Sequence, residues 1–143
     1  MNYSRREQFK KALTVVGILA AVLVIGIPIS LGFYLSTESH LVLREAKNAK
    51  LALEMVALTQ TTKNIYDADA SGGMAEGVWE GVSPYVEDGC VLSLDGFDAK
   101  TRQVTALTYS NKNFRVVYTV NDNGKHKWEI DYLIKIQEYT DQD

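Results

Sequence analysis

The segment "DADASG" contains the residues of this chain that come closest to a ligand set. Asp67, Asp69 and Ser71 stand at the first, third and fifth places of an EF-hand-type calcium loop, and Gly72 stands at the sixth place. The twelfth place, where such a loop needs a bidentate glutamate, is Val78. Two interpretations therefore stay open, a calcium site and a solvated connecting loop, and the missing glutamate favours the connecting loop.

The other residue types that carry chemistry are sparse. Cys90 is the one cysteine of the chain and begins an apolar segment, where a lone cysteine is typically a small buried hydrophobe. His40 and His126 lie far apart and, with one cysteine, form no zinc-binding spacing. The sequence has no nucleophile elbow and no phosphate-binding glycine loop. We therefore expect neither catalysis nor a cofactor.

Overall charge also excludes one class of partner. The formal net charge is −3 over 143 residues. Such a chain generates no positive field that would attract nucleic acid, so we expect no nucleic-acid partner.

The most informative segment is apolar and runs without a charged residue from Lys11 to Glu38. A helix of that length spans roughly 39 Å at about 1.5 Å per residue, and a bilayer's hydrocarbon core is about 30 Å thick. The apolar part of a secretory signal is shorter, about 7–15 residues. Phe33 and Tyr34 near the end of the segment suit a membrane–water interface. We therefore predict a transmembrane helix over residues 12–35, with a cleaved signal and a soluble core helix as the alternatives.

The charges that flank this segment predict its orientation. Four cations precede it: Arg5, Arg6, Lys10 and Lys11. Glu7 is the single acid among them, and the other flank begins with Glu38. Because the positive flank of a span stays in the cytoplasm, we expect residues 1–11 to form a cytoplasmic basic leader and residues 36–143 to form an extracytoplasmic domain.

Small residues recur within the predicted span at the spacing that lets helices approach closely. Gly17 and Ala21 are four residues apart, as are Gly26 and Ser30, and Pro28 lies between the members of the second pair. These five residues are candidates for helix–helix packing. The alternative is that small residues are simply common in spanning helices.

A second helical pattern follows the span. Its apolar residues recur at steps of three and four: Val42, Ala46, Ala49, Leu53 and Val56. Leu41, Ala52 and Leu58 are expected to widen this stripe. Since neither proline nor glycine lies between Tyr34 and Ile65, we expect the two helical segments to be continuous, with a bend near Pro28.

From Cys90 onward the apolar residues alternate with polar ones, which predicts strands. The expected strands are residues 90–94, 103–110, 113–120 and 127–136. We expect a turn at Asp95-Gly96 and a hairpin at Asn123-Gly124. Before the strands, "MAEGVWEGVSPYV" predicts a short helix or a loop, in which Trp79 is either a core residue or an exposed contact.

The last two strands present matching apolar faces. One face carries Trp128, Ile130, Tyr132, Ile134 and Ile136, and the other carries Phe114, Val116, Tyr118 and Val120. An antiparallel meander with one apolar face needs a cover, and the helical stripe is available. We therefore predict an α+β fold in which a long N-terminal helix packs on a four-stranded antiparallel meander.

This layout of basic leader, apolar helix, amphipathic helix and antiparallel sheet resembles a type IV pilin or pseudopilin. The run "VVGILAAVLVIGIP" is similar to the pilin stem, in which G-I-L-A-A is followed by small apolar residues and proline. The resemblance implies cleavage between Ala12 and Leu13, which would leave "LTVVG" in place of the family's F-T-L-I-E. Gly17 then stands where the family has a glutamate, so the chain resembles a minor pilin or a pseudopilin.

The resemblance implies a structural subunit of a pilus or pseudopilus-like filament at the cell surface. Such a subunit would associate with copies of itself, or with related pilin-like subunits, through its apolar helix. The alternative is a single-pass, membrane-anchored extracytoplasmic binding domain that does not polymerise. The fate of residues 1–12 separates the two, because only the pilin-like protein should lose them.

Overall fold

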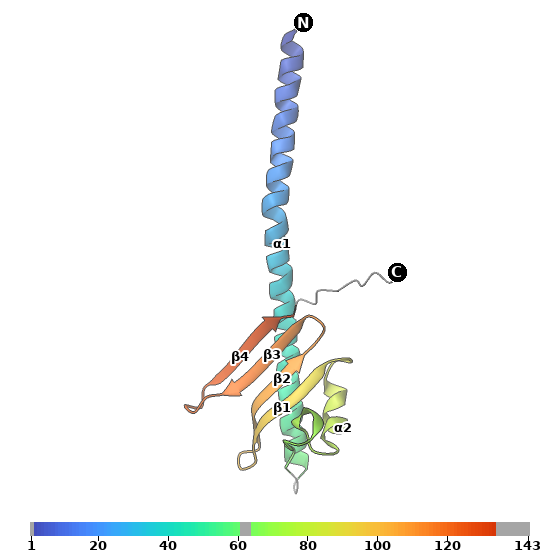
Figure 1. The fold of residues 1–143 in the computed structure, drawn as a ribbon, viewed down its shortest axis with the longest axis vertical. Helices are drawn as coiled ribbons and strands as arrows, with labels where there is room; N and C mark the ends of the chain where they lie inside the picture. The colour runs from blue at the N-terminus through green and yellow to red at the C-terminus, as the bar shows by residue number, and fades with distance from the viewer. Residues whose placement is uncertain (1, 61–63, 134–143) are drawn as a thin grey trace, which may run out of the picture. The chain divides into compact units, whose positions relative to one another are not determined.

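A long N-terminal helix is followed by short helices and a four-stranded sheet. The computed structural model describes residues 2–60 and 64–133, with side chains from residue 5 onward. The helical elements are α1 (Asn2–Thr59), η1 (Ser71–Gly73), α2 (Val78–Val82) and η2 (Ser83–Tyr85), and the strands are β1 (Val91–Asp98), β2 (Gln103–Ser110), β3 (Phe114–Val120) and β4 (His126–Tyr132). This arrangement confirms the predicted α+β class (Figure 1).

The chain divides into two compact units, residues 1–38 and 39–143. Helix α1 runs through both units without interruption, as expected, and contains Pro28 in its interior. The first unit consists of the N-terminal part of α1. The predicted division into a cytoplasmic leader (1–11), a transmembrane helix (12–35) and an extracytoplasmic domain (36–143) is defined relative to a membrane. This division stays a prediction.

In the second unit the C-terminal part of α1 buries its predicted stripe. Val42, Ala46, Ala49, Leu53 and Val56 are each at most 5% exposed, and Ala52 is buried as well. Figure 1 shows this part of the helix lying against the sheet. The prediction for Leu41 and Leu58 is wrong, because these side chains are 54% and 63% exposed. Successive helical residues point about 100° apart, so neither side chain reaches the sheet.

The sheet is an antiparallel meander with the order β1-β2-β3-β4. In the β3–β4 hairpin Val116 lies opposite Ile130 and Tyr118 lies opposite Trp128, which confirms the matching apolar faces. Gly124 takes a positive φ of 73° in the predicted turn. Trp128 and Ile130 are only half-buried, since β4 is an edge strand. The predicted face residues Ile134 and Ile136 lie outside the described residues.

The expected turn at Asp95-Gly96 is wrong, because both residues lie inside β1. The register between β1 and β2 shifts on both sides of Gly96. A Cβ on Gly96 would lie 2.6 Å from Thr105 Oγ1, so the strands approach too closely there for a side chain. The glycine marks a bulge in a strand that continues to Asp98.

Helix α1 ends at Thr59, although the sequence has neither proline nor glycine between Thr59 and Ile65. Ile65 is fully buried, and its carbonyl accepts a hydrogen bond from the Ala75 amide at 2.9 Å. Tyr66 forms an isolated antiparallel bridge with Met74. Ile65 and Tyr66 therefore form backbone contacts with the following loop and are not part of an α-helix.

The loop lies against the edge of the sheet at η1. A Cβ on Gly73 would lie 1.9 Å from the Leu94 carbonyl oxygen, so only glycine allows this contact with β1. Before the strands, where the sequence predicted either a short helix or a loop, the structure has the short helices α2 and η2.

Candidate functional site

Two regions are candidates for function: the apolar surface of α1 in the first unit and a groove beside β1 in the second. The helical segment is apolar and long enough to cross a membrane, and none of its apolar window is buried. Its large exposed side chains include Leu13, Val16, Leu19, Leu23 and Ile27, each at least 53% exposed. A surface of this kind needs an apolar partner, either lipid or other helices.

The five predicted packing residues all lie on this exposed helix. A Cβ on Gly17 or Gly26 would meet no atom within 4 Å, so both positions are open to a neighbour. An α-helix has about 3.6 residues per turn, which places Gly17, Ala21 and Pro28 on one face. Gly26 comes nine residues after Gly17, about two and a half turns, so Gly26 and Ser30 lie on the opposite face. The small residues thus allow close approach from two sides.

The hydroxyl groups of Thr14 and Ser30 form hydrogen bonds within the helix. Ser30 Oγ donates to the Gly26 carbonyl at 2.7 Å, and Thr14 Oγ1 donates to the Lys10 carbonyl at 2.9 Å. Such bonds remove the need for water, since neither lipid nor an apolar helix offers polar partners. The predicted cleavage residues Ala12 and Leu13 also lie on the exposed helix.

Two of the predicted calcium ligands, Asp67 and Asp69, lie in the loop before η1, and Ser71 is the first residue of η1. Asp67, Asp69 and Ser71 are exposed. An Asp67 carboxylate oxygen accepts a hydrogen bond from the Asp69 amide at 3.1 Å, a local turn that needs no metal. The described residues include no cluster of three or more histidine, cysteine or acidic side chains suited to a metal. Calcium binding stays a prediction.

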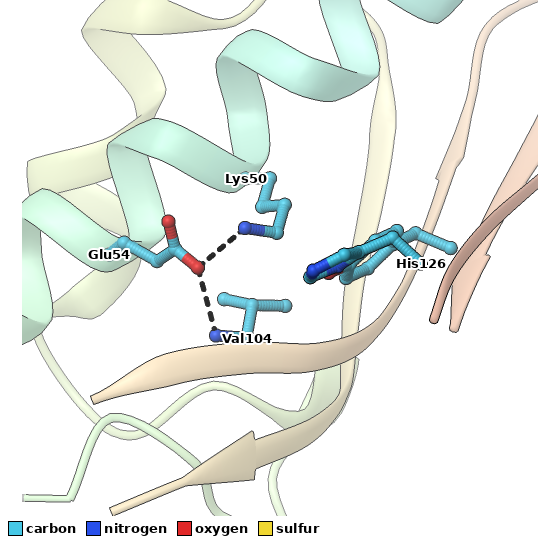
Figure 2. A network of polar contacts seen from close by, with 5 residues as sticks. Lys50, Glu54, Val104 and His126 are labelled. Atoms are coloured by element: carbon cyan, nitrogen blue, oxygen red, sulfur yellow. Dashed lines mark hydrogen bonds and ion pairs between the residues drawn. The ribbon is translucent and has the colours of Figure 1, made fainter. Parts of the chain in front are cut away.

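A polar network joins α1 to the sheet at the β1–β2 irregularity. A Glu54 carboxylate oxygen accepts from the Lys50 ammonium at 2.6 Å and from the Val104 amide at 3.1 Å (Figure 2). The Arg102 guanidinium donates to the Ala57 carbonyl at 3.3 Å, in the last turn of the helix. The helix therefore satisfies a backbone amide of β2 at the shifted register.

An aromatic cluster borders this network. The Tyr118 hydroxyl is hydrogen-bonded to Nδ1 of His126, and its ring lies 4.4 Å from that of Trp128. The ammonium groups of Lys50 and Lys47 lie over the Tyr118 and Trp128 rings, at 5.3 and 5.8 Å. His126 is exposed and its ring nitrogen is hydrogen-bonded to Tyr118. These contacts position β4 against the helix.

Tyr109 forms a second link between the sheet and α1. It is fully buried, and its hydroxyl donates to a Glu45 carboxylate oxygen at 3.0 Å. Burial, and next the bond to Glu45, raises the pKa of Tyr109 above its ordinary value. Burial also raises the pKa of the Cys90 thiol, although the neighbouring Tyr109 hydroxyl opposes the shift. Cys90 itself is half-buried and lines the groove beside β1.

The groove beside β1 has a volume of about 660 Å³. Trp79 and Met74 provide apolar surface, and Glu76 and Glu80 provide carboxylates. Trp79 is 41% exposed, so the interpretation as an exposed contact fits better than the interpretation as core. The wall on the sheet side is the start of β1, from Cys90 to Ser93.

Sequence reasoning missed the groove and most of the polar network. The spacing of Lys50 and Glu54 is a signal for an ion pair on a helix, but nothing local indicates that Glu54 also accepts from Val104. That contact joins residues fifty positions apart. The groove likewise depends on where the loop returns to β1.

Comparisons with protein-family models, with curated proteins and with solved structures find no match to this chain. The pilin-like character therefore rests on the layout alone: a long apolar N-terminal helix followed by a four-stranded antiparallel sheet.

Proposed function

We propose that this protein is a structural subunit of a pilus or pseudopilus-like filament that assembles through its apolar N-terminal helix. The observation that carries the proposal is the continuity of α1, whose exposed apolar part leads directly into the part that packs on the sheet. A subunit of this type acts by binding other subunits, so we propose no catalytic activity.

The surface of the first unit supports the proposal. Covering one leucine-sized side chain contributes about 1.5–3 kcal/mol, and exposed apolar residues occur all round the helix. Small residues on two opposite faces, with Gly17 on one and Gly26 on the other, permit close neighbours on both sides. A filament core supplies such neighbours, whereas a simple pair of helices would use one face.

The proposal includes a location. The helix lies in the membrane before assembly, with the N-terminus in the cytoplasm and residues 36–143 outside. The cations Arg5, Arg6, Lys10 and Lys11 support this orientation through the positive-inside tendency. After assembly the second unit would lie at the cell surface.

A second candidate function is favoured by the groove beside β1. A single-pass anchor with an extracytoplasmic binding domain would keep α1 in the bilayer and use the groove of about 660 Å³ for a ligand. This protein would not polymerise and would keep residues 1–12.

Intact-mass spectrometry of the native protein tests the two candidates. The protein is taken from membranes and from material sheared from the cell surface. The filament proposal expects a mass that lacks Met1 to Ala12, in both fractions. A full-length mass confined to membranes would contradict it and favour the anchored binding domain.

A further inference from the structure

Charge is strongly segregated within the second unit. Residues 64–99 contain eight acidic residues and no lysine, arginine or histidine. Residues 111–127 contain four lysine or arginine residues and a single acid, Asp122. Since the net charge of the chain is only −3, this contrast is a matter of distribution rather than of composition.

The fold places the groove and the β3–β4 turn toward opposite edges of the sheet. The acidic segment contains β1, the first strand in the order β1-β2-β3-β4, and the basic segment contains the inner strand β3 and the turn that leads into the edge strand β4. Figure 1 shows the β3–β4 turn and α2 on opposite sides of the sheet. The basic turn therefore cannot reach the acidic groove of its own chain.

The groove has the chemistry of a site for a cationic side chain. Glu76 and Glu80 line it on either side of Trp79 in the sequence, and neither carboxylate forms an ion pair within residues 2–60 and 64–133. An exposed indole face attracts a lysine ammonium within about 6 Å of its centre. Carboxylates and an aromatic ring together thus select a cation with an aliphatic stem.

The β3–β4 turn has the complementary charge and is exposed. Its residues, Asn121 to Lys125, are all exposed, as are His126 and Lys127 at the start of β4. Gly124 closes the turn tightly, because its amide donates a hydrogen bond to the Asn121 carbonyl at 2.8 Å. Lys127 is paired with Glu129. In the described part of the chain Lys125 forms no ion pair, so its ammonium is available to a partner.

We propose that the β3–β4 turn of one copy docks in the groove of a second copy, with Lys125 between Glu76 and Glu80 and over the Trp79 ring. The inference rests on the proposed self-association and adds a contact between neighbouring outer domains. Because each copy offers its turn at one edge and its groove at the other, the contact is head-to-tail and leaves both ends of a row open. It extends a row of subunits rather than closing a pair.

Disulfide trapping in full-length protein tests the inference, because native Cys90 lines the groove and is the one cysteine of the chain. The variant Asn123→Cys adds a thiol to the turn and keeps Lys125. Mild oxidation with copper phenanthroline in membranes should give a ladder of dimers, trimers and higher forms. Lys100→Cys, in the exposed β1–β2 turn, is the matched control and should give at least tenfold less product.

Charge reversal tests the role of Lys125. Adding Lys125→Glu to Asn123→Cys should lower the cross-linked yield at least tenfold, and further addition of Glu76→Lys and Glu80→Lys should restore it. Adding Cys90→Ser should remove the ladder, since the bond joins two different sites. An undiminished yield with Lys125→Glu would overturn the inference.

A second measurement separates this contact from assembly through the helix. Mass photometry in detergent at 1 M salt, where the Debye length is about 3 Å, reports helix-driven association while the charged contact is screened. Association at 1 M salt without the ladder at low salt would overturn docking of the turn and leave the filament proposal standing. A ladder without association at 1 M salt would support docking and count against assembly through the helix.

Discussion

Helix α1 has two parts that differ in what covers their apolar side chains. In the second unit the stripe that includes Ala46 and Leu53 is buried within the chain. In the first unit the side chains of residues such as Leu19 and Leu23 are more than half exposed. One continuous helix therefore contains a segment whose apolar side chains its own sheet covers and a segment whose apolar side chains are exposed. Mutations in the covered part should therefore lower the free energy of unfolding, and mutations in the exposed part should lower association between copies.

The largest effect is expected in the covered part. Leu53→Ala should lower the free energy of unfolding of the second unit by about 2–5 kcal/mol, because it removes a fully buried side chain and leaves a cavity. The matched control is Leu58→Ala, whose side chain is 63% exposed and which should cost about 0.5 kcal/mol or less. Urea unfolding of the full chain in detergent, followed by tryptophan fluorescence, measures both. Equal losses would contradict the assignment of the buried stripe.

The contact between Glu54 and the sheet ranks next. Glu54→Ala should cost about 1–3 kcal/mol, because it leaves the Val104 amide and the Lys50 ammonium without their acceptor. Glu129→Ala removes the exposed pair with Lys127 and should cost about 1 kcal/mol or less. The same urea titration compares them. A cost of Glu54→Ala no greater than that of Glu129→Ala would show that the network adds nothing beyond a surface pair.

The uncovered part of α1 should respond in assembly and not in folding. Gly17→Leu and Gly26→Leu fill positions where a neighbour could approach, so each should lower the association constant at least tenfold, about 1.4 kcal/mol. Val22→Leu keeps a large side chain and serves as the control. Mass photometry measures association, and urea unfolding should be unchanged in all three variants. If only Gly17→Leu lowers association, the helix packs through the face that carries Gly17 and not through the face that carries Gly26.

The smallest effect concerns Tyr109. Tyr109→Phe should cost about 0.5–1.5 kcal/mol at neutral pH, because the bond to Glu45 is lost while the ring stays buried. The raised pKa makes the hydroxyl hold its proton longer in the folded state, so its contribution is complete below the ordinary tyrosine value of 10.0 and declines as the pH rises above it. The unfolding free energy of the parent should therefore fall more steeply above pH 10 than that of Tyr109→Phe. Parallel pH profiles would contradict the linkage.

Several features of the fold could be predicted from the sequence. The stripe from Val42 to Val56 follows from helical periodicity, and the strands from Gln103 onward follow from alternation and from the Asn123-Gly124 turn. The apolar segment before Glu38 is recognisable from composition alone. Each of these signals lies within a few neighbouring residues, where local sterics and periodicity decide.

Long-range contacts decided the features that the sequence did not reveal. Asp95-Gly96 has the composition of a turn, yet its approach to Thr105 makes it a bulge. Helix α1 ends at Thr59, and Ile65 beyond it is fully buried and accepts a hydrogen bond from the Ala75 amide, a contact between residues ten positions apart that no local pattern predicts.

The sequence by itself determined the helical and strand periodicities and an apolar segment that the chain does not bury. It also determined the acidic and basic segments, but not where they lie relative to each other in the sheet. Only the tertiary structure separated Glu76 and Glu80 from Lys125 across the sheet and formed a groove beside β1. The physical reason is that a charge acts through its position in space, and the strand order sets that position for residues far apart in the chain.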